Sequence, residues 1–264
     1  MTDEFSVLGP DDPPPFNILQ VEPSRPALLV CDHASNRVPA KFHNFGVSRE
    51  DMQTHCALDI GAGAVTRLLS RRLVLPAVLA GYSRLVVDCN RRLDDPTAFP
   101  ASIDGVVVPG NHQLTHADRQ VRADALYWAY HHAVRDQLGL LEAMAKAPAL
   151  IAVHSFAPIL IGKHRPWDIG VLWDKDPRMP VPLIEGLRKI PDLVVGDNEP
   201  YSGRHAHDFT VDHHAEAEGL PHVGIELRQD LIDTDAGAAH WTELLAGVLE
   251  PILSDPDLYT HWTR

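Results

Sequence analysis

Hydrophobic positions in this chain form short unbroken runs that are separated by stretches with amphipathic spacing. Unbroken runs of Val, Ile, Leu and Ala are typical of strands buried on both faces of a parallel sheet. Apolar residues three to four positions apart are typical of helices packed on such a sheet. The predicted strands are 27–31, 77–80, 84–89, 150–153, 169–173, 193–195 and 223–227. The predicted helices are 58–72, 117–141, 183–189 and 236–253, with Thr115 and Thr234 as expected N-caps.

This alternation of strands and helices predicts an α/β fold with three layers, in which helices cover both faces of a mixed, largely parallel central sheet. We expect one domain over residues 27–264, because no linker or internal repeat divides them. Residues 1–26 are acidic and rich in proline, which predicts an extended N-terminal tail lying on the domain. The segment 94–114 is rich in Pro, Gly, Asn and Asp, and its length is typical of a lid or binding loop.

The composition narrows the class of protein. The chain has 264 residues, of which 45% are hydrophobic, so it can bury a sizeable core. A formal net charge of -13 disfavours nucleic acid and anionic membranes as partners. The 3 cysteines do not indicate a disulfide framework. Because neither a long apolar segment nor a signal peptide is recognisable, we expect a soluble protein of the cytoplasm. No oligomeric state is predicted.

Two of the apolar runs end in a histidine. His33 follows the run 27–31, and His154 ends the run 149–153. In an open α/β sheet the ligand crevice lies beyond the carboxyl ends of the strands, so both side chains are expected to face one crevice. For either histidine alone, a hydrogen bond at a strand end is the simpler interpretation. The matched pair favours a shared metal ion, and a catalytic zinc typically takes three protein ligands and a water.

The spacing alone leaves the third ligand open. A carboxylate is the expected type, and the chain offers Asp32, Asp59, Asp88 and Glu226. Glu226 begins inside an apolar run, where a carboxylate has either a cationic partner or a raised pKa. Arg228, on the same side of the predicted strand, is the cationic partner to consider. The alternative for Glu226 is a general base that takes a proton from a metal-activated water.

Other polar residues form a candidate binding set. Arginine binds carboxylates through two parallel hydrogen bonds, and Arg84 and Arg91 flank an apolar run in an otherwise acidic chain. Salt bridges to neighbouring aspartates are the alternative for both. Further along the chain, a polar loop offers Tyr201, Ser202 and His214. Neither a Gly-x-Ser-x-Gly motif nor a phosphate-binding glycine loop is present, so serine-nucleophile and nucleotide chemistry are not predicted.

Seven short segments occur in order over nearly the whole predicted domain. They are 31–39 (CDHASNRVP), 58–62 (LDIGA), 82–91 (YSRLVVDCNR), 154–156 (HSF), 198–203 (NEPYSG), 210–214 (TVDHH) and 219–230 (GLPHVGIELRQD). Together they resemble the N-formylglutamate amidohydrolase (N-formylglutamate deformylase) family. Each segment is short, but the ordered set is specific. The resemblance implies a fold like that of zinc carboxypeptidases and zinc amidases. It also implies a zinc-dependent hydrolase of the amide bond of N-formyl-L-glutamate, yielding formate and L-glutamate in histidine degradation.

By analogy with related zinc amidases, the resemblance implies that His33, a carboxylate and His154 hold the zinc and that Glu226 is the general base. Asp59 is the expected carboxylate, because Asn36 stands where carboxypeptidase-like sites have a glutamate. The expected binders of a small carboxylate-bearing substrate are Asn36, Arg84, Arg91, Tyr201, Ser202, His214 and Arg228. A zinc peptidase or an amidase of another N-acyl substrate is the first alternative. The second is a protein of the same fold that binds a small acidic ligand without turnover.

Overall fold

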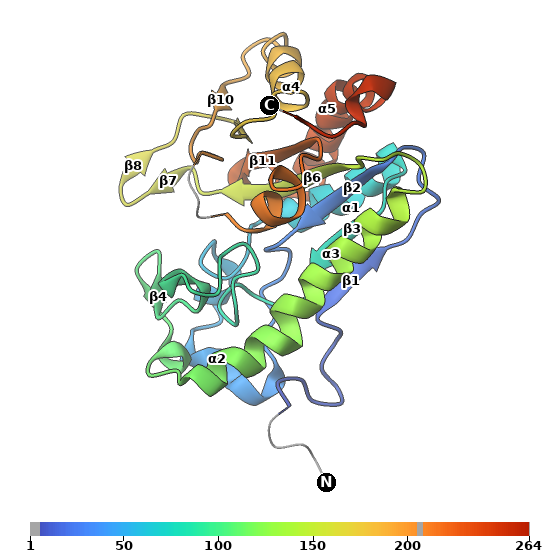
Figure 1. Cartoon of the computed structure of the whole chain (residues 1–264). Helices are drawn as coiled ribbons and strands as arrows, with labels where there is room; N and C mark the ends of the chain where they lie inside the picture. Colours follow the sequence, from blue (N-terminus) through green and yellow to red (C-terminus); the bar gives the residue numbers. More distant parts are fainter. Residues whose placement is uncertain (1–5, 205–207, 264) are drawn as a thin grey trace.

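The structure is a computed structural model, and it describes residues 6–204 and 208–263. A seven-stranded sheet forms its centre (Figure 1). β3, β2, β6 and β11 run parallel to one another, β1 and β9 are antiparallel to β3 and β11, and β10 is parallel to β9. The predicted mixed, largely parallel sheet is therefore confirmed. In spatial order the strands are β1 (Phe16–Leu19), β3 (Ala77–Ala80), β2 (Ala27–Cys31), β6 (Ala149–Phe156), β11 (His222–Arg228), β9 (Ile169–Leu172) and β10 (Val195–Asp197).

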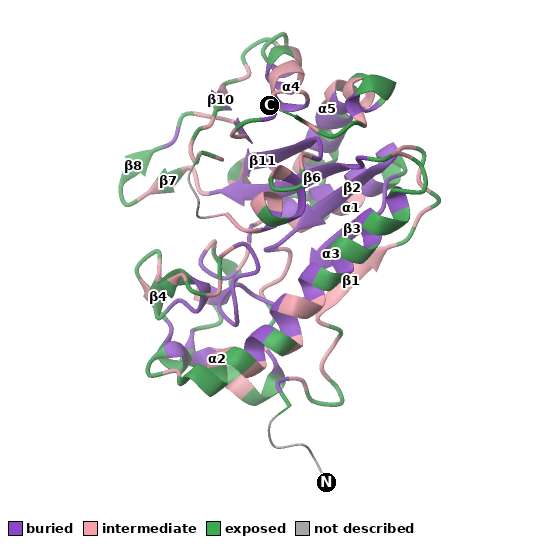
Figure 2. Ribbon diagram, in the orientation of Figure 1, coloured by how far each residue is buried: buried purple, intermediate pink, exposed green. Residues whose placement is uncertain are grey.

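Helices cover both faces of this sheet, and its five inner strands are buried, whereas the edge strands β1 and β10 are partly exposed (Figure 2). Alternate strand residues serve the two faces, as the pleat requires. Leu29 and Ile151 pack with α1, α4 and α5, whereas Leu28 and Leu150 pack with α3. The three-layer α/β/α arrangement expected from the sequence is confirmed. The helices are α1 (Ala62–Leu73), α2 (His116–Arg122), α3 (Trp128–Leu141), α4 (Pro180–Leu187) and α5 (Asp235–Leu253).

The predicted helix over 117–141 is one continuous path through α2, a π-helical segment at Ala123–Tyr127, and α3. Thr115 begins it with a capping box, since its hydroxyl accepts from the backbone N–H of Asp118 and the Asp118 carboxylate accepts from the N–H of Thr115. Thr234 likewise accepts from the N–H of Gly237 at the start of α5. Both expected N-caps are confirmed.

The first helix starts later than predicted, and the difference positions Asp59. Gly61 has a φ of 78°, and a Cβ at this position would lie 2.2 Å from the carbonyl oxygen of Ile232. Only glycine fits such a left-handed, closely packed turn. The chain therefore turns over residues 58–61 before α1 begins at Ala62. The Asp59 N–H donates to the carbonyl of His33, which ties this turn to the end of the first central strand.

The predicted strand over 84–89 is wrong. The segment is a buried irregular loop, and its apolar side chains Leu85, Val86 and Val87 belong to a cluster made of loops and the start of the long helical path. Its backbone is satisfied without a neighbouring strand, because Asn111 donates to the Leu85 carbonyl and Arg122 to the Val86 carbonyl. Burial and β-branching are common to both arrangements, so the apolar run did not distinguish a strand from a loop inside a core.

Two other segments add detail to the predictions. Within the expected N-terminal tail, Phe16–Leu19 pairs with β3 as an edge strand of the sheet. The predicted binding loop over 94–114 contains a short hairpin, β4 (Ser102–Ile103) and β5 (Val106–Val107), and a second hairpin follows β6 as β7 (Ile159–Leu160) and β8 (Lys163–His164). In the described part of the chain, no helix combines the length and apolar character needed to cross a lipid bilayer.

Candidate metal centre and active site

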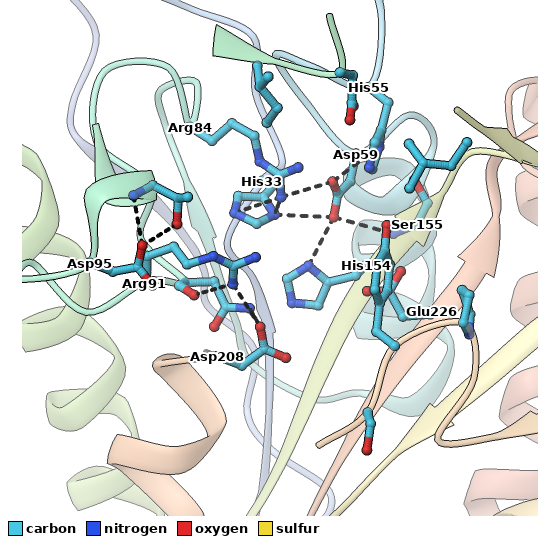
Figure 3. A pocket seen from close by; sticks show the side chains of 18 of the residues that line it. His33, His55, Asp59, Arg84, Arg91, Asp95, His154, Ser155, Asp208 and Glu226 are labelled. Carbon is cyan, nitrogen blue, oxygen red and sulfur yellow. Dashed lines mark hydrogen bonds and ion pairs between the residues drawn. The ribbon is translucent and has the colours of Figure 1, made fainter. Parts of the chain in front are cut away.

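His33 and His154 come from neighbouring parallel strands and meet at one place. β2 and β6 are paired in parallel, His33 lies two residues beyond the last residue of β2, and His154 lies on β6. Their ring centroids are 5.2 Å apart, and both side chains are buried. The expectation that the two rings face one crevice agrees with this arrangement (Figure 3).

Asp59 lies between the two rings. Its Oδ2 is 3.3 Å from His33 Nδ1 and 2.9 Å from His154 Nδ1. Ligand atoms of these three residues all lie within 4.8 Å of one another, which defines the His33–Asp59–His154 group. Burial by itself would raise the pKa of Asp59, but Arg84 and the two histidines overcome it and hold that pKa well below its usual range. The carboxyl is therefore ionised and available to a cation.

The donor set fits a divalent metal such as zinc, whose protein ligands are imidazole nitrogens and carboxylate oxygens. Five buried polar atoms around the group form no hydrogen bond with any described residue, although some lie within ion-pair distance of one: Asp32 Oδ2, Asp59 Oδ1, His55 Nδ1, Arg84 Nε and Glu226 Oε2. Leaving such an atom without a partner costs about 1–3 kcal/mol, and more for a charged group. A cation beside Asp59 would offset part of that cost.

Arg84 reaches into the group instead of standing at the edge of the cavity. Its Nη2 contacts His33 Nδ1 and lies 3.4 Å from Asp59 Oδ1, and its Nε lies 3.6 Å from Asp88 Oδ2. The guanidinium is almost fully buried. We predicted a substrate-binding arginine, and the structure places its positive charge directly beside the His33–Asp59–His154 group.

Glu226 lies next to His154 because β6 and β11 are paired in parallel with these two residues in register. Its strand neighbours Ile225 and Leu227 join the apolar cluster on the opposite face of the sheet, so Glu226 points toward the cavity (Figure 3). Burial raises the pKa of Glu226 to about 8, and His154 opposes that rise. Arg228, the alternative partner in the sequence, is instead paired with Asp168 and Asp230.

The group opens into a cavity of about 890 Å³. Arg91, Tyr201 and Ser202, three of the predicted substrate binders, line it, and Asp208 lines it beside them. Arg91 Nη1 donates to Asp208 Oδ1 over 2.8 Å. Arg165 donates to the Tyr201 hydroxyl over 3.0 Å and lies over its ring. The segment 94–114, which we predict to be a lid or binding loop, contributes lining residues as well.

Three residues of the predicted binding set lie away from this cavity. Asn36 donates to the carbonyl of Met52. Arg228 is taken up by the ion pairs described above and by the carbonyl of Trp167. His214 is buried in a π-helical segment, where its Nε2 lies 3.0 Å from His131 Nδ1. The polar character of the segment around His214 suggested a ligand-facing loop, but the backbone coils and turns this side chain inward.

Two residues near the site, His55 and Asp208, have no role in the sequence-based predictions. Asp88 appears there only as one of several possible carboxylate ligands. His55 lines the cavity with its Nδ1 3.7 Å from Asp59 Oδ1, and burial lowers its pKa to about 4. Its position four residues before Asp59 was the one available signal, and that spacing becomes informative only once the turn at 58–61 is known. Asp88 and Asp208 carried no spacing signal, because each lies in an irregular segment. Asp208 lines the cavity, whereas Asp88 contacts His33 from outside it.

Fold and site together define an α/β protein with a candidate His–Asp–His metal centre beside the central strands. The chain belongs to the N-formylglutamate amidohydrolase family, whose model matches residues 25–233, and this membership indicates an amidohydrolase. The chain is similar to the solved structure of the gene product Atu2144 from Agrobacterium tumefaciens, with 33% sequence identity and a TM-score of 0.87. The match covers 93% of this chain and 99% of that one.

A second solved structure, N-formylglutamate amidohydrolase from Ralstonia eutropha JMP134, is 19% identical to this chain. It has a TM-score of 0.69 and covers 90% of this chain and 97% of its own, and at that identity the likeness concerns the fold. No curated protein matches the chain.

Proposed function

We propose that the protein is a zinc-dependent amidohydrolase that cleaves N-formyl-L-glutamate, or a closely related N-acyl amino acid, to a carboxylic acid and the free amino acid. One observation carries the proposal: in a member of an amidohydrolase family, two histidines and an ionised aspartate converge beside a buried glutamate at the floor of a cavity. His33, Asp59 and His154 would hold the metal. When bound there, zinc supplies a Lewis acid that polarises an amide carbonyl and acidifies a water.

Glu226 is the residue of this site suited to move a proton. It accepts the proton from the attacking water as the new C–O bond forms, and it delivers the same proton to the amine nitrogen as the C–N bond breaks. A pKa near 8 means that burial has made its neutral form accessible, whereas a cation beside it favours the ionised form that acts as base. The carboxyl therefore suits both halves of the transfer.

Arg84 is placed to stabilise negative charge on the carbonyl oxygen. Its buried guanidinium is beside the His33–Asp59–His154 group, which is where the amide carbon must lie for Glu226 to serve the attacking water. A preorganised cation in a buried site stabilises developing charge more than one in water. We therefore assign Arg84 to the reacting carbonyl in place of the predicted substrate carboxylate.

Arg91, Tyr201 and Ser202 are the proposed binders of the substrate carboxylate. The Tyr201 hydroxyl accepts from Arg165, which leaves its hydrogen free to donate into the cavity. Arg91 already pairs with Asp208, so a substrate carboxylate has to share that guanidinium or displace Asp208 from it. This competition predicts that binding by Arg91 affects KM more than kcat.

The experiment is to strip the purified chain of metal, reload it with zinc, and measure amine release from a substrate panel. N-formyl-L-glutamate, N-formyl-L-glutamine, N-acetyl-L-glutamate and a dipeptide separate the acyl group from the side-chain charge. We expect zinc to be bound, and turnover of an N-acyl amino acid to require it. A chain that binds zinc but hydrolyses none of the four would contradict the proposal, and peptide cleavage alone would replace it with a peptidase.

A further inference from the structure

Each histidine of the His33–Asp59–His154 group is held between two carboxylates. On the Nδ1 side both rings face Asp59. On the Nε2 side each ring meets a carboxylate of its own: His33 Nε2 lies 2.7 Å from Asp88 Oδ1, and His154 Nε2 lies 3.1 Å from Asp32 Oδ2. An imidazole held at both nitrogens cannot rotate about χ2 without losing one of these contacts.

Asp32 is the first residue after β2. It does not line the cavity, and it contacts the Nε2 of His154. It is 1% exposed, so its charge has no access to water. Thr210 donates to its Oδ1 over 2.7 Å. Its Oδ2 forms an ion pair with His154 Nε2, and the Tyr130 hydroxyl is a second hydrogen-bonding neighbour of the carboxylate. A charge buried this deeply needs such partners, and His154 is the one that belongs to the metal group.

Asp88 holds His33 from the loop that replaces the predicted strand. The N–H of Asn90 donates to its Oδ1, the same oxygen that faces His33, and the guanidinium of Arg84 lies near its Oδ2. Asp88 is also buried and outside the cavity lining. The hydrogen bond from the Asn90 N–H therefore fixes the carboxylate oxygen that contacts His33.

A single side chain connects the supports of the two carboxylates. Asn90 accepts at its Oδ1 from the N–H groups of Phe209 and Thr210, both over 3.0 Å. Thr210 is the residue that holds Asp32, and the N–H of Asn90 is the donor that holds Asp88. The two histidines are therefore oriented by one connected set of bonds and not by independent packing.

We propose that Asp32 and Asp88 are positioning residues of the metal centre, each of which contacts the Nε2 of one histidine and so holds its Nδ1 toward Asp59. This inference rests on the proposed metal site. The three residues with converging ligand atoms are His33, Asp59 and His154. Asp32 and Asp88 meet the nitrogens on the far side of the rings, so a metal beside Asp59 would have them as outer partners and not as ligands. Such partners typically contribute 10- to 100-fold to metal affinity.

The test measures zinc affinity, which does not depend on turnover. Metal-free full-length chain is titrated with zinc in competition with a chromogenic chelator, for the wild type and for Asp32→Ala, Asp88→Ala, Asp32→Asn and Asp88→Asn. We expect each alanine variant to raise the Kd about 10- to 100-fold. The asparagine variants should recover part of the loss, because a carboxamide oxygen still accepts from Nε2–H and the side chain keeps its shape.

Two controls separate the proposed role from general effects of charge. Asp94→Ala removes the same charge from an exposed side chain that pairs with Arg92, and its Kd should match the wild type. Arg84→Ala removes the guanidinium beside Asp88, and because it removes a cation from the site it should leave zinc binding as tight or tighter. The Co²⁺-substituted proteins supply a spectroscopic readout, since visible bands that shift in Asp32→Ala or Asp88→Ala report altered ligand geometry.

The outcomes distinguish the inference from the function on which it rests. If the wild type binds no zinc, the proposed function fails together with the inference. If the wild type binds zinc and the folded alanine variants bind within about twofold of it, only the inference fails. Asp59→Ala, which removes a proposed ligand, is titrated in the same way, and a loss as large as its loss would overturn the inference because it would make Asp32 or Asp88 a direct ligand.

Discussion

Two places in this molecule bring buried histidines together, and their chemical surroundings are opposite. In the His33–Asp59–His154 group, carboxylates contact every ring nitrogen. In the His131–His214 pair, the rings lie 3.0 Å apart at His131 Nδ1 and His214 Nε2, and neither forms an ion pair with a carboxylate within the described ranges. The first place is beside the cavity, whereas the second is covered by aromatic side chains such as Tyr127 and Phe209.

The pKa directions follow from that difference. Burial lowers the pKa of His154, but the carboxylates of Asp32 and Asp59 overcome it and raise that pKa well above its ordinary value. Burial lowers the pKa of His131 to about 4 and that of His214 to about 3, with no carboxylate strong enough to compensate. His131 Nε2–H donates to the Cys89 carbonyl, so its Nδ1 is left to accept from His214. Burial of a histidine therefore does not identify a ligand, and in these two places the partners of the ring nitrogens set the direction of the pKa shift.

The largest effect that would break this comparison concerns turnover. Glu226→Gln should lower kcat by about 10²–10⁴-fold, because the site loses its proton carrier. Zinc should stay bound. The stability of the metal-free chain should change little, since with a pKa of about 8 the carboxyl is largely neutral at pH 7, like the amide that replaces it. Steady-state kinetics, metal analysis and urea unfolding supply the three readouts.

Glu218→Gln makes the same chemical change at an exposed residue of the neighbouring segment and should leave kcat unaltered. Full activity of Glu226→Gln would assign the proton transfer to another group, and His55, which also lines the cavity, would be examined next.

The elements that position the His33–Asp59–His154 group were predictable from the sequence to different degrees. Strands 27–31 and 77–80 were predicted with the bounds observed, whereas the predicted strand 150–153 is shorter than β6, which continues through the polar residues His154 and Ser155. His33 and His154 followed from those runs. Asp59 was one of several carboxylates, and its place depends on a left-handed turn at Gly61 that periodicity does not reveal.

Other features lay beyond any local pattern. The loop over 84–89 brings Arg84 and Asp88 to the site, but its apolar residues are those of a strand, and only its packing against distant loops separates the two possibilities. His214 was predicted in the binding set from a polar motif. Its side chain turns into the core because His131, 83 residues earlier in the chain, supplies a hydrogen bond there. Contacts at such separations are set by the fold as a whole.

The next largest effect is the stabilisation of the folded chain by bound zinc, which should depend on His33 but not on His214. At a free zinc concentration about 100 times the Kd, the free energy of unfolding should rise by about 2.7 kcal/mol. His33→Ala should abolish that increment, because it removes a proposed ligand. His214→Gln should retain it, because the pair is outside the group. Urea unfolding with and without zinc checks both variants, and equal zinc increments in the two would contradict the assignment of His33.

The His131–His214 pair should make the metal-free protein sensitive to acid. Both histidines have a folded-state pKa below the value of about 6.5 in an unfolded chain, so the unfolded state takes up protons first as the pH falls. Their contribution to stability is intact above pH 6.5 and is lost as the pH falls toward 4. Between pH 6.5 and 5 we expect a loss of about 2 kcal/mol for each histidine.

Urea unfolding of the metal-free chain at several pH values measures this slope. His214→Gln keeps a donor for His131 Nδ1 but removes one titrating group, so its slope should be shallower by about 2 kcal/mol over the same interval. His240→Gln, on the exposed face of α5, should keep the wild-type slope. An unchanged slope in His214→Gln would show that the pair does not titrate as proposed.

The smallest expected effect concerns His222, which tests whether a carboxylate alone reverses the behaviour of a buried histidine. His222 Nε2 forms an ion pair with Glu216 Oε2 over 2.8 Å. Glu216 is two residues beyond His214 in the chain, and the ion pair lies outside the His33–Asp59–His154 group. Burial lowers the pKa of His222, but Glu216 raises it above its ordinary value, and the histidine lowers the pKa of Glu216.

The contribution of His222 to stability is therefore full below pH 6.5 and is lost as the pH rises through the raised pKa. His222→Gln should cost about 1 kcal/mol at pH 6 and less at pH 9, as measured by urea unfolding. A cost that grows toward pH 9 would mean that His222 is buried neutral like His214, and the partner rule drawn from the two histidine groups would then fail.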